Sequence, residues 1–265
     1  MHQQIMIAQS IVSGGGGGGS PPTSLVGLTY WYDGDDDGLS FINADGTSVA
    51  ADGDPVRLNI SAGGIGRRLV DEAGRMTRRK PVRAPSGGMF SSYDSGSSPA
   101  NFQGNSTGAP STFNQIFSAG TSLVIAAIRI DNASPTTGAD WTEGALVSDA
   151  NYGGLQFVRV GTEVLIRGYN YASAGVQTVT VTRPFGEWIV LTWDRRAGRN
   201  RLRINGVQVA DVASGNTAVT SSFMTFGALS DLSIAQFCTA RSANTPAAIL
   251  EVERWMAAKI GVTIP

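Results

Sequence analysis

The first candidate for chemistry is a group of acidic residues that closely follows an aromatic run. Asp33, Asp35 and Asp37, followed by Gly38, form the pattern D-x-D-x-D-G. Alternate carboxylates supply the hard oxygen ligands that Ca²⁺ prefers, and the glycine allows a tight turn. The second half of a calcium loop is missing, because its twelfth position is Ala44 instead of a bidentate glutamate. Two interpretations therefore stay open, a calcium site and an acidic surface turn.

Aromatic and amide side chains in the sequence could bind a sugar. Binding pockets are lined mainly by apolar and aromatic groups, with a few polar groups that fix the ligand's orientation. Most of the aromatic residues, including Trp188 and Trp193, are expected in the core. The candidates that neighbour Gly, Asn, Asp or Ser in expected loops are Trp141, Tyr152 and Tyr171, with Asn151 and Asn170 beside them.

Two groups of basic residues could bind carboxylate or phosphate groups, because guanidinium groups bind both bidentately. The first consists of Arg67, Arg68, Arg75, Arg78, Arg79, Lys80 and Arg83. It predicts either contact with an acidic partner or a solvated surface. The second consists of Arg195, Arg196, Arg199, Arg201 and Arg203. It favours solvated loops and strand edges, which charge protects from pairing with other chains.

Several kinds of site are excluded by the residues that the chain lacks. His2 is the only histidine and lies near the N-terminus, so Ser-His-Asp and Cys-His catalysis have no central base. Cys238 is the only cysteine, which rules out an intramolecular disulfide and a Cys/His zinc site. We expect Cys238 to be a small buried hydrophobic residue. Any catalysis would depend on carboxylates.

The composition narrows the partners further. The 265 residues carry a formal net charge of -1, which disfavours nucleic-acid binding through excess Lys and Arg. The most apolar stretch, Leu123 to Ile130, is far shorter than the roughly 20 residues of a membrane-spanning helix. Neither nucleic acid nor membrane is expected as a partner.

Short runs of β-branched and aromatic residues, separated by Gly, Asn, Asp and Ser, predict an antiparallel sandwich or barrel. The expected strands are 28–32, 123–130, 155–160, 164–169, 176–181, 188–193, 202–204, 207–212, 223–226 and 232–237. Asn205-Gly206 predicts a type I′ hairpin turn. A helix is expected at 246–260, with Glu251 and Glu253 near its start and Gly261 after its end. Residues 81–112 are expected to form a long loop.

The N-terminal residues read as an arm and a linker, separate from one globular domain. Gly14 to Gly19 are six consecutive glycines, which we expect to be mobile. The preceding apolar residues are Ile5, Met6, Ile7, Ile11 and Val12. They either dock on a partner or form a frayed tail. The expected boundaries are 1–24 for the arm and linker, and 25–265 for the domain, including the helix 246–260.

Three segments together resemble a known family. They are LTYWYDGDDDGL at 28–39, the paired strands at 188–209 with the hairpin RLRINGV at 201–207, and SIAQF at 233–237 followed by EVERWMAAKIG at 251–261. These segments are similar to concanavalin A-like (LamG-like) jelly-roll domains of bacteriophage structural proteins. The resemblance implies an all-β jelly-roll β-sandwich with one C-terminal helix and an extended N-terminal arm. It also implies possible calcium at the sandwich rim.

The resemblance implies a function as well. A hydrolase branch of the family carries E-x-D-x-x-E on one strand, and none of the six glutamates here has that spacing. The expected function is therefore a non-enzymatic virion protein, anchored to capsid or tail subunits by its arm, with a lectin-like domain that binds host-surface glycans. The alternative is a capsid decoration protein without sugar binding, and a polysaccharide-active enzyme ranks below both. We expect a homo-oligomer in the particle.

Overall fold

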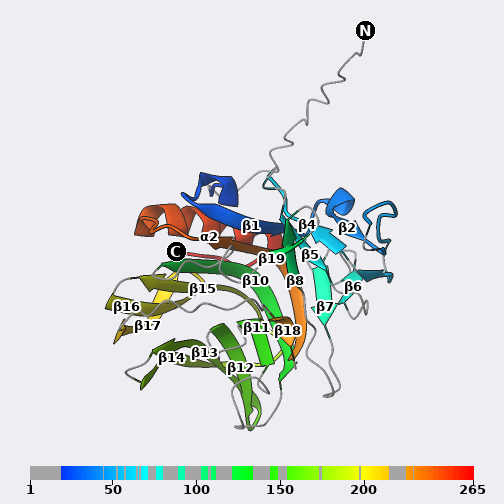
Figure 1. The fold of residues 1–265 in the computed structure, drawn as a ribbon. Helices are drawn as coiled ribbons and strands as arrows, with labels where there is room; N and C mark the ends of the chain where they lie inside the picture. The colour runs from blue at the N-terminus through cyan, green and yellow to red at the C-terminus, as the bar shows by residue number, and fades with distance from the viewer. Residues whose placement is uncertain are drawn as a thin grey trace.

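The computed structural model describes the chain from residue 19 to residue 265 with internal gaps. The residues outside the description are 1–18, 44, 52, 57, 64, 66, 71–75, 80–88, 93–102, 107–108, 112–120, 134–143, 149–153, 173–174, 197, 215–224 and 229. The described part forms three antiparallel sheets and one α-helix (Figure 1). The predicted all-β jelly-roll sandwich with a C-terminal helix is confirmed.

A nine-stranded sheet is the central layer of the molecule. Its strands follow the order β17-β16-β15-β10-β19-β7-β6-β3, and β1 also pairs with β19. They are β1 (Leu28–Asp33), β3 (Pro55–Val56), β6 (Met76–Arg79), β7 (Met89–Ser92), β10 (Ser122–Ala133), β15 (Trp188–Arg196), β16 (Gly198–Ile204), β17 (Val207–Ser214) and β19 (Ser230–Ala240). β10 is buried along most of its length because it lies between β15 and β19 in the middle of the layer.

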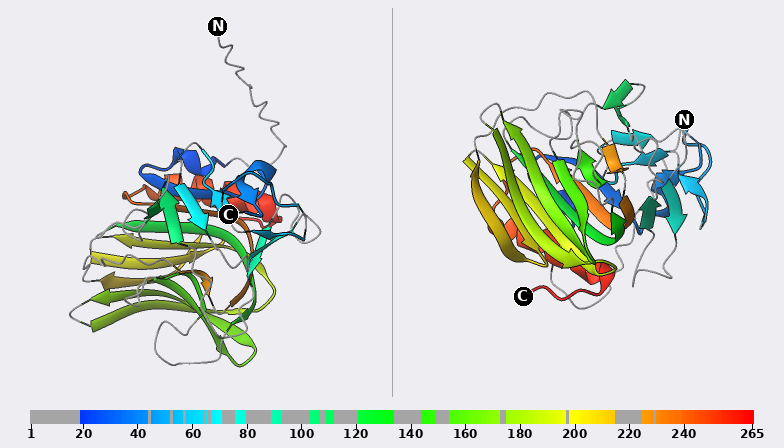
Figure 2. Two further views of the ribbon diagram at one scale, coloured as in Figure 1. Left: turned by 45° about the vertical axis from the view of Figure 1, so that its right-hand side comes forward. Right: turned by 90° about the horizontal axis from the view of Figure 1, so that it is seen from below.

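A five-stranded sheet packs on one face of the central layer (Figures 1 and 2). Its order is β14-β13-β12-β11-β18, formed by β11 (Gly144–Ser148), β12 (Gly154–Val160), β13 (Glu163–Ala172), β14 (Gly175–Pro184) and β18 (Thr225–Ala228). The core between the two sheets contains Phe157, Ile166 and Val179 from the smaller sheet and Val124 and Trp193 from the larger. Alternation along each strand explains this, since every second side chain points inward.

A buried polar link joins the two sheets within this core. Trp193 Nε1 donates a hydrogen bond to Asn200 Oδ1 at 2.6 Å, and Asn200 Nδ2 donates to the carbonyl of Gly168 at 3.1 Å. A Cβ atom at Gly168 would lie 2.4 Å from Trp193 Nε1, so only glycine allows this approach of the sheets. Trp193 is therefore structural, as the sequence predicted.

Helix α2 (Pro246–Ile260) covers the opposite face of the central layer. Thr245 caps it by accepting a hydrogen bond from the Ala248 N–H at 3.1 Å, and Gly261 ends it in the left-handed region. The predicted bounds are confirmed, but the first turn contains no acidic residue. Glu253 instead lies in the middle of the helix with 0% exposure. The sequence interpretation of Glu253 as an early acidic residue is wrong.

The second core cluster lies between α2 and the central layer. Ile249, Val252 and Met256 of the helix pack here with Ile125 of β10 and Cys238 of β19. Cys238 is buried as predicted, and burial raises the pKa of its thiol far above the ordinary value. Within the part of the chain that the structure describes, no helix is long and apolar enough to span a membrane.

The third sheet lies beside α2 and has the order β2-β4-β5-β8-β9 (Figure 1). It is formed by β2 (Ser40–Phe41), β4 (Leu58–Ile60), β5 (Arg67–Val70), β8 (Gln103–Ser106) and β9 (Ala109–Ser111), and the 3₁₀ helices η1 (Pro22–Ser24) and η2 (Asp37–Leu39) precede it. The prediction of one long loop at 81–112 is wrong, because β7, β8 and β9 fall inside it. These strands are rich in Ser, Gly and Asn, so only their partner strands reveal them.

The hairpin between β16 and β17 forms as Asn205-Gly206 predicted. Both residues have positive φ, 49° and 79°, as a type I′ turn requires. Asn205 also bonds to β15, because its Oδ1 accepts the Val190 N–H and its own N–H donates to the Val190 carbonyl, each at 2.8 Å. The turn is therefore fixed to the adjacent strand.

Candidate functional site

The outer face of the five-stranded sheet is the first candidate site. Leu155 and Phe157 of β12 point into the core, so the alternate residues Gln156 and Val158 lie on the face turned away from it. Both are buried, whereas Val160 further along the same face is 52% exposed. On β14 the outer positions are the exposed Thr180 and Thr182. Across the middle of this face, exposure therefore increases from the buried Gln156 of β12 to the exposed Thr180 of β14.

A polar row crosses three strands on this face. Gln156 of β12 is directly opposite Arg167 of β13, which in turn is opposite Thr180 of β14. The Arg167 Nε–H donates to Gln156 Oε1 at 2.8 Å. Gln156 is fully buried and orients Arg167, so the half-buried guanidinium of Arg167 and the exposed hydroxyl of Thr180 are the groups of this row that can orient a polar ligand.

The structure corrects the placement of two predicted sugar-binding residues. Asn170 and Tyr171 were expected in a loop, but they belong to β13, opposite Gln177 and Val176 of β14. The strand extends further than the sequence indicated because β14 continues the pairing up to the turn. Position 171 follows 167 and 169 in the alternation of β13, so it belongs to the outer face.

The other predicted sugar-binding residues lie outside the described residues. They are Trp141, Asn151 and Tyr152. β11 ends at Ser148 and β12 begins opposite it at Gly154, which pairs with Tyr169 near the end of β13. The chain positions that flank Asn151 and Tyr152 therefore share one end of the sheet with Asn170 and Tyr171. β11 begins at Gly144, opposite Phe157, so the chain that follows Trp141 enters further along the sheet.

The acidic turn after β1 is bound to other parts of the fold. Asp33 Oδ1 accepts hydrogen bonds from the Asp35 N–H at 3.0 Å and from Gln236 Nε2 at 2.8 Å. Burial raises the pKa of Asp33, and the hydrogen bond from Gln236 partly opposes this. Asp35 forms an ion pair with Lys259 of α2, whose ammonium group lies 4.9 Å from the centre of the Trp255 ring. The turn thus fastens β1 to the helix.

The calcium interpretation of this turn stays a prediction. Asp36 Oδ1 accepts the Gly38 N–H at 2.9 Å and so caps η2, while the side chain of Asp37 is outside the description. Among the described residues, no group of three or more His, Cys, Asp or Glu side chains is arranged to hold a metal ion. Asp33 Oδ1 and Asp35 Oδ2 already have protein partners.

The first basic group is divided between two sheets. Arg67 and Arg68 belong to β5 of the third sheet, whereas Arg78 and Arg79 belong to β6 of the central layer. Neighbouring strand positions face opposite sides. The four residues therefore do not occupy one face, and Arg75, Lys80 and Arg83 lie outside the described residues. The apolar arm residues Ile5, Met6, Ile7, Ile11 and Val12 are also outside them.

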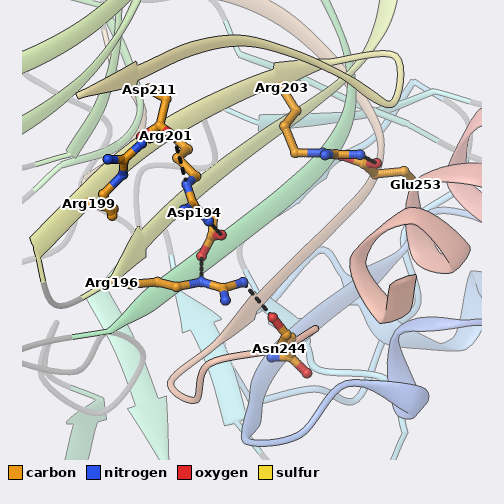
Figure 3. Close-up of polar contacts among 8 residues, drawn as sticks. All are labelled: Asp194, Arg196, Arg199, Arg201, Arg203, Asp211, Asn244 and Glu253. Carbon is orange, nitrogen blue, oxygen red and sulfur yellow. Dashed lines mark hydrogen bonds and ion pairs between the residues drawn. The ribbon is translucent and has the colours of Figure 1, made fainter. Parts of the chain in front are cut away.

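Three members of the second basic group, Arg196, Arg199 and Arg201, form a ladder of ion pairs on the side of the central layer that carries α2 (Figure 3). Asp194 Oδ1 accepts from Arg196 Nε at 2.9 Å, and Asp194 Oδ2 lies 3.8 Å from Arg201. Asp211 pairs with Arg201 Nε at 3.3 Å and with Arg199. The hydrogen bond from Arg199 lowers the pKa of Asp211. The expectation of solvated arginines holds for Arg199, whose side chain is 48% exposed, whereas Arg196 and Arg201 are partly buried and paired with acidic neighbours. Arg195 is buried and donates to Ser122 Oγ at 3.1 Å.

A buried ion pair continues this ladder to the helix. Arg203 donates to both carboxylate oxygens of Glu253 at 2.8 Å each, and to the Gly206 carbonyl at 2.7 Å (Figure 3). The hydrogen bond to Glu253 raises the pKa of Arg203. Sequence reasoning missed this pair. The spacing of Arg199, Arg201 and Arg203 at every second position was the available signal, because it places all three on one face of β16.

The start of the described chain is held against α2. The Ser20 N–H donates to the Glu251 carbonyl at 3.1 Å. A Cβ atom at Gly19 would lie 2.4 Å from the Trp255 nitrogen and 2.5 Å from the Glu251 oxygen. The last linker glycine therefore touches the helix backbone, where no other residue fits.

Comparisons with known proteins support the fold and name no family. No family model matches the sequence, and no curated protein matches it either. Among solved structures, the binding domain of botulinum neurotoxin DC in complex with SialylT matches with a TM-score of 0.52 and 12% identity, covering 82% of this chain. The binding domain of botulinum neurotoxin serotype D matches with a TM-score of 0.51 and 13% identity over 84% of the chain. The chain spans about half the length of these structures, 50% and 51%.

Proposed function

We propose that this protein is a lectin-like module that binds glycans with the outer face of its five-stranded sheet. The main support is that the linker and the outer face lie on opposite sides of the molecule. Gly19 and the C-terminal residues pack on α2, on one side of the central layer, whereas the five-stranded sheet covers the other side. The polar row Gln156–Arg167–Thr180 and position 171 lie on the face furthest from the linker. One of the similar structures is a binding domain in complex with SialylT, which supports a sugar as the ligand class.

The wider proposal is a bacteriophage virion protein. Residues 1–24 attach it to a capsid or tail subunit, and residues 25–265 form the displayed domain, so its location is the virion. The resemblance of residues 28–39, 201–207 and 233–261 to phage jelly-roll domains supports this origin, and so does a linker that leaves from the side opposite the outer face. We propose binding rather than catalysis, since both similar structures are described as binding domains.

A glycan array with the full chain tests sugar binding. Tyr171→Ala is expected to weaken binding by tenfold or more, because stacking on an aromatic ring would be lost while the position lies at the end of a strand. Val26→Ala is the matched control, since Val26 is 66% exposed on the side of the molecule that carries α2. No glycan bound by the parent chain, or equal loss in both variants, contradicts the proposal.

The second candidate is a capsid decoration protein that binds no sugar, and a polysaccharide-active enzyme ranks below it. A reconstruction of the intact particle separates the first two. An arm seated in a capsid or tail subunit with the outer face in solvent supports display. An outer face buried between neighbouring subunits favours decoration. Normal incorporation of a chain without residues 1–24 contradicts the anchoring role of the arm. Turnover of bacterial polysaccharides would favour the enzyme.

A further inference from the structure

The free edges of the two core sheets differ in how they are guarded against pairing. Natural sheets protect free edges with bulges, charges, proline or very short strands. β18, at one edge of the five-stranded sheet, has four residues. β17, at the edge of the central layer, has an irregular register opposite Leu202 and Arg203 and carries Asp211 in its ion-pair ladder. Both edges therefore have such protection.

β14, at the other edge of the five-stranded sheet, has almost none. It is ten residues long and pairs with β13 without any register shift. Residues 175–182 contain no charge, and the only proline, Pro184, is at the end of the strand. Within the described part of the chain, β14 pairs with β13 alone. Among the described residues, its second row of backbone N–H and C=O groups has no strand partner.

The residues of β14 are sorted by face. Val179 is buried and Val181 is half-buried against the core, while Thr180 and Thr182 are exposed on the outer face. Such a strand pairs best with a partner that continues both rows, with hydroxyl groups opposite hydroxyl groups on the outer face and valines opposite valines on the inner face. The same strand from a second copy meets that condition.

We propose that two copies of this chain associate through β14, paired antiparallel about a two-fold axis at Thr180. In an antiparallel pair, residues directly opposite each other place their side chains on the same face of the sheet. A two-fold axis normal to the sheet meets this condition only where one residue lies opposite its own copy. Centred at Thr180, it places Val179 opposite Val181, Thr182 opposite Thr178, and Arg183 opposite Gln177. On each face a β-branched residue then lies opposite another β-branched residue, and no two like charges lie opposite each other.

The neighbouring registers are poorer. Centring on Val181 places Arg183 opposite the buried Val179, and centring on Val179 places Gln177 opposite Val181 on the inner face. The Thr180 register is thus selected by the side chains. A partner chosen by charge has little to recognise, because the strand is uncharged before Arg183. A second copy is therefore the occupant.

This pairing also fits the placement of the linker and the outer face on opposite sides of the molecule. It joins the two five-stranded sheets into one sheet of ten strands, whose outer faces point the same way. The two α2 helices, and the linkers held at Gly19, lie together on the opposite side.

Cysteine cross-linking tests the register in the full chain. The native Cys238 is buried and does not compete. In Thr180→Cys the two thiols face each other across the axis, so mild oxidation is expected to give a disulfide-linked dimer that reductant separates. In the matched Thr182→Cys the two positions are four residues apart, about 13 Å, beyond the reach of a disulfide. No cross-link in Thr180→Cys, or equal cross-linking in both, overturns the proposed register.

Sedimentation velocity tests the dimer itself. We expect the parent chain to be a dimer and Thr180→Lys to be a monomer with an unchanged circular dichroism spectrum, because two ammonium groups would oppose each other at the axis. Val209→Lys, on the guarded edge and 41% exposed, is expected to stay dimeric. A monomeric or trimeric parent chain overturns the proposal. If Val209→Lys dissociates the dimer and Thr180→Lys does not, the contact belongs to β17, and the proposal of a β14 contact is overturned.

Discussion

At the scale of single residues, the buried pair of Arg203 and Glu253 is expected to matter most for stability. Glu253 is fully buried and accepts two hydrogen bonds of 2.8 Å. Glu253→Ala leaves the guanidinium without its compensating charge, which costs about 3–5 kcal/mol in comparable buried pairs. Urea denaturation of the parent chain and the variant measures the loss.

The matched control lies two residues earlier on the same helix. Glu251 pairs with Arg254 at 3.3 Å, with side chains 40% and 36% exposed. Because solvent screens such a pair, Glu251→Ala is expected to cost less than about 1 kcal/mol. If both variants lost equal stability, the loss would come from the general effect of replacing a glutamate in the helix, and the ion pair with Arg203 would contribute nothing specific.

Two aspartates are expected to give opposite pH dependences. Burial raises the pKa of Asp33, so its contribution to stability is fully present below its unfolded pKa and is lost as the pH rises through the higher folded value. Hydrogen bonds from Thr47 lower the pKa of Asp45, so its contribution is present above the unfolded pKa and lost on acidification.

Substitution by asparagine measures this difference. Relative to the parent chain, Asp33→Asn is expected to gain stability as the pH rises from about 4 toward 7, where the parent carries the buried charge. Asp45→Asn is expected to lose relative stability over the same range. Denaturation curves at several pH values give both slopes, and slopes of the same sign would contradict the assignment.

At the scale of elements, the β16–β17 hairpin is expected to depend on its contact with the C-terminal tail. A Cβ atom at Gly206, where φ is 79°, would lie 2.4 Å from Ile264 Cγ2. Gly186 has a φ of 80° but no atom within 4 Å of the same position. Gly186→Ala is expected to cost about 1–2 kcal/mol from backbone strain alone. Gly206→Ala should cost more, because Ile264 must also move, and equal losses would show that the tail is not packed there.

The elements also show what the sequence could predict. Strands with β-branched residues, such as β10 and β15, and the capped helix α2 were predictable because their own residues favour them. β8 and β9 contain Gly, Asn, Ser and Pro. β8 forms by pairing with β5, and β9 by pairing with β8, which no local pattern reveals. The end of β13 at Asn170 and Tyr171 was missed for the same reason, since β14 continues the ladder there.

The candidate site was less predictable than the fold. Aromatic residues beside small polar ones suggested Tyr171, but the row of Gln156, Arg167 and Thr180 comes from three consecutive strands, at positions 11 and then 13 residues apart. Only the register aligns them. The acidic turn was visible as a motif, whereas its partners Gln236 and Lys259 come from β19 and α2, more than 200 residues later. Spacing within one segment cannot predict such contacts.

At the scale of the whole molecule, residues before position 25 already contact the globular body. Ser20 bonds to α2, Gly19 contacts its backbone, and Pro22 is buried. Removing residues 1–18 is therefore expected to leave the Tm unchanged. Removing residues 1–24 also deletes these contacts, about 1 kcal/mol or more of burial and hydrogen bonding, and should lower the Tm by about 2–4 °C. Calorimetry on the two truncated chains measures this. Equal Tm values of the two truncated chains would show that the contacts of residues 19–24 do not stabilise the domain, in agreement with a boundary at residue 25.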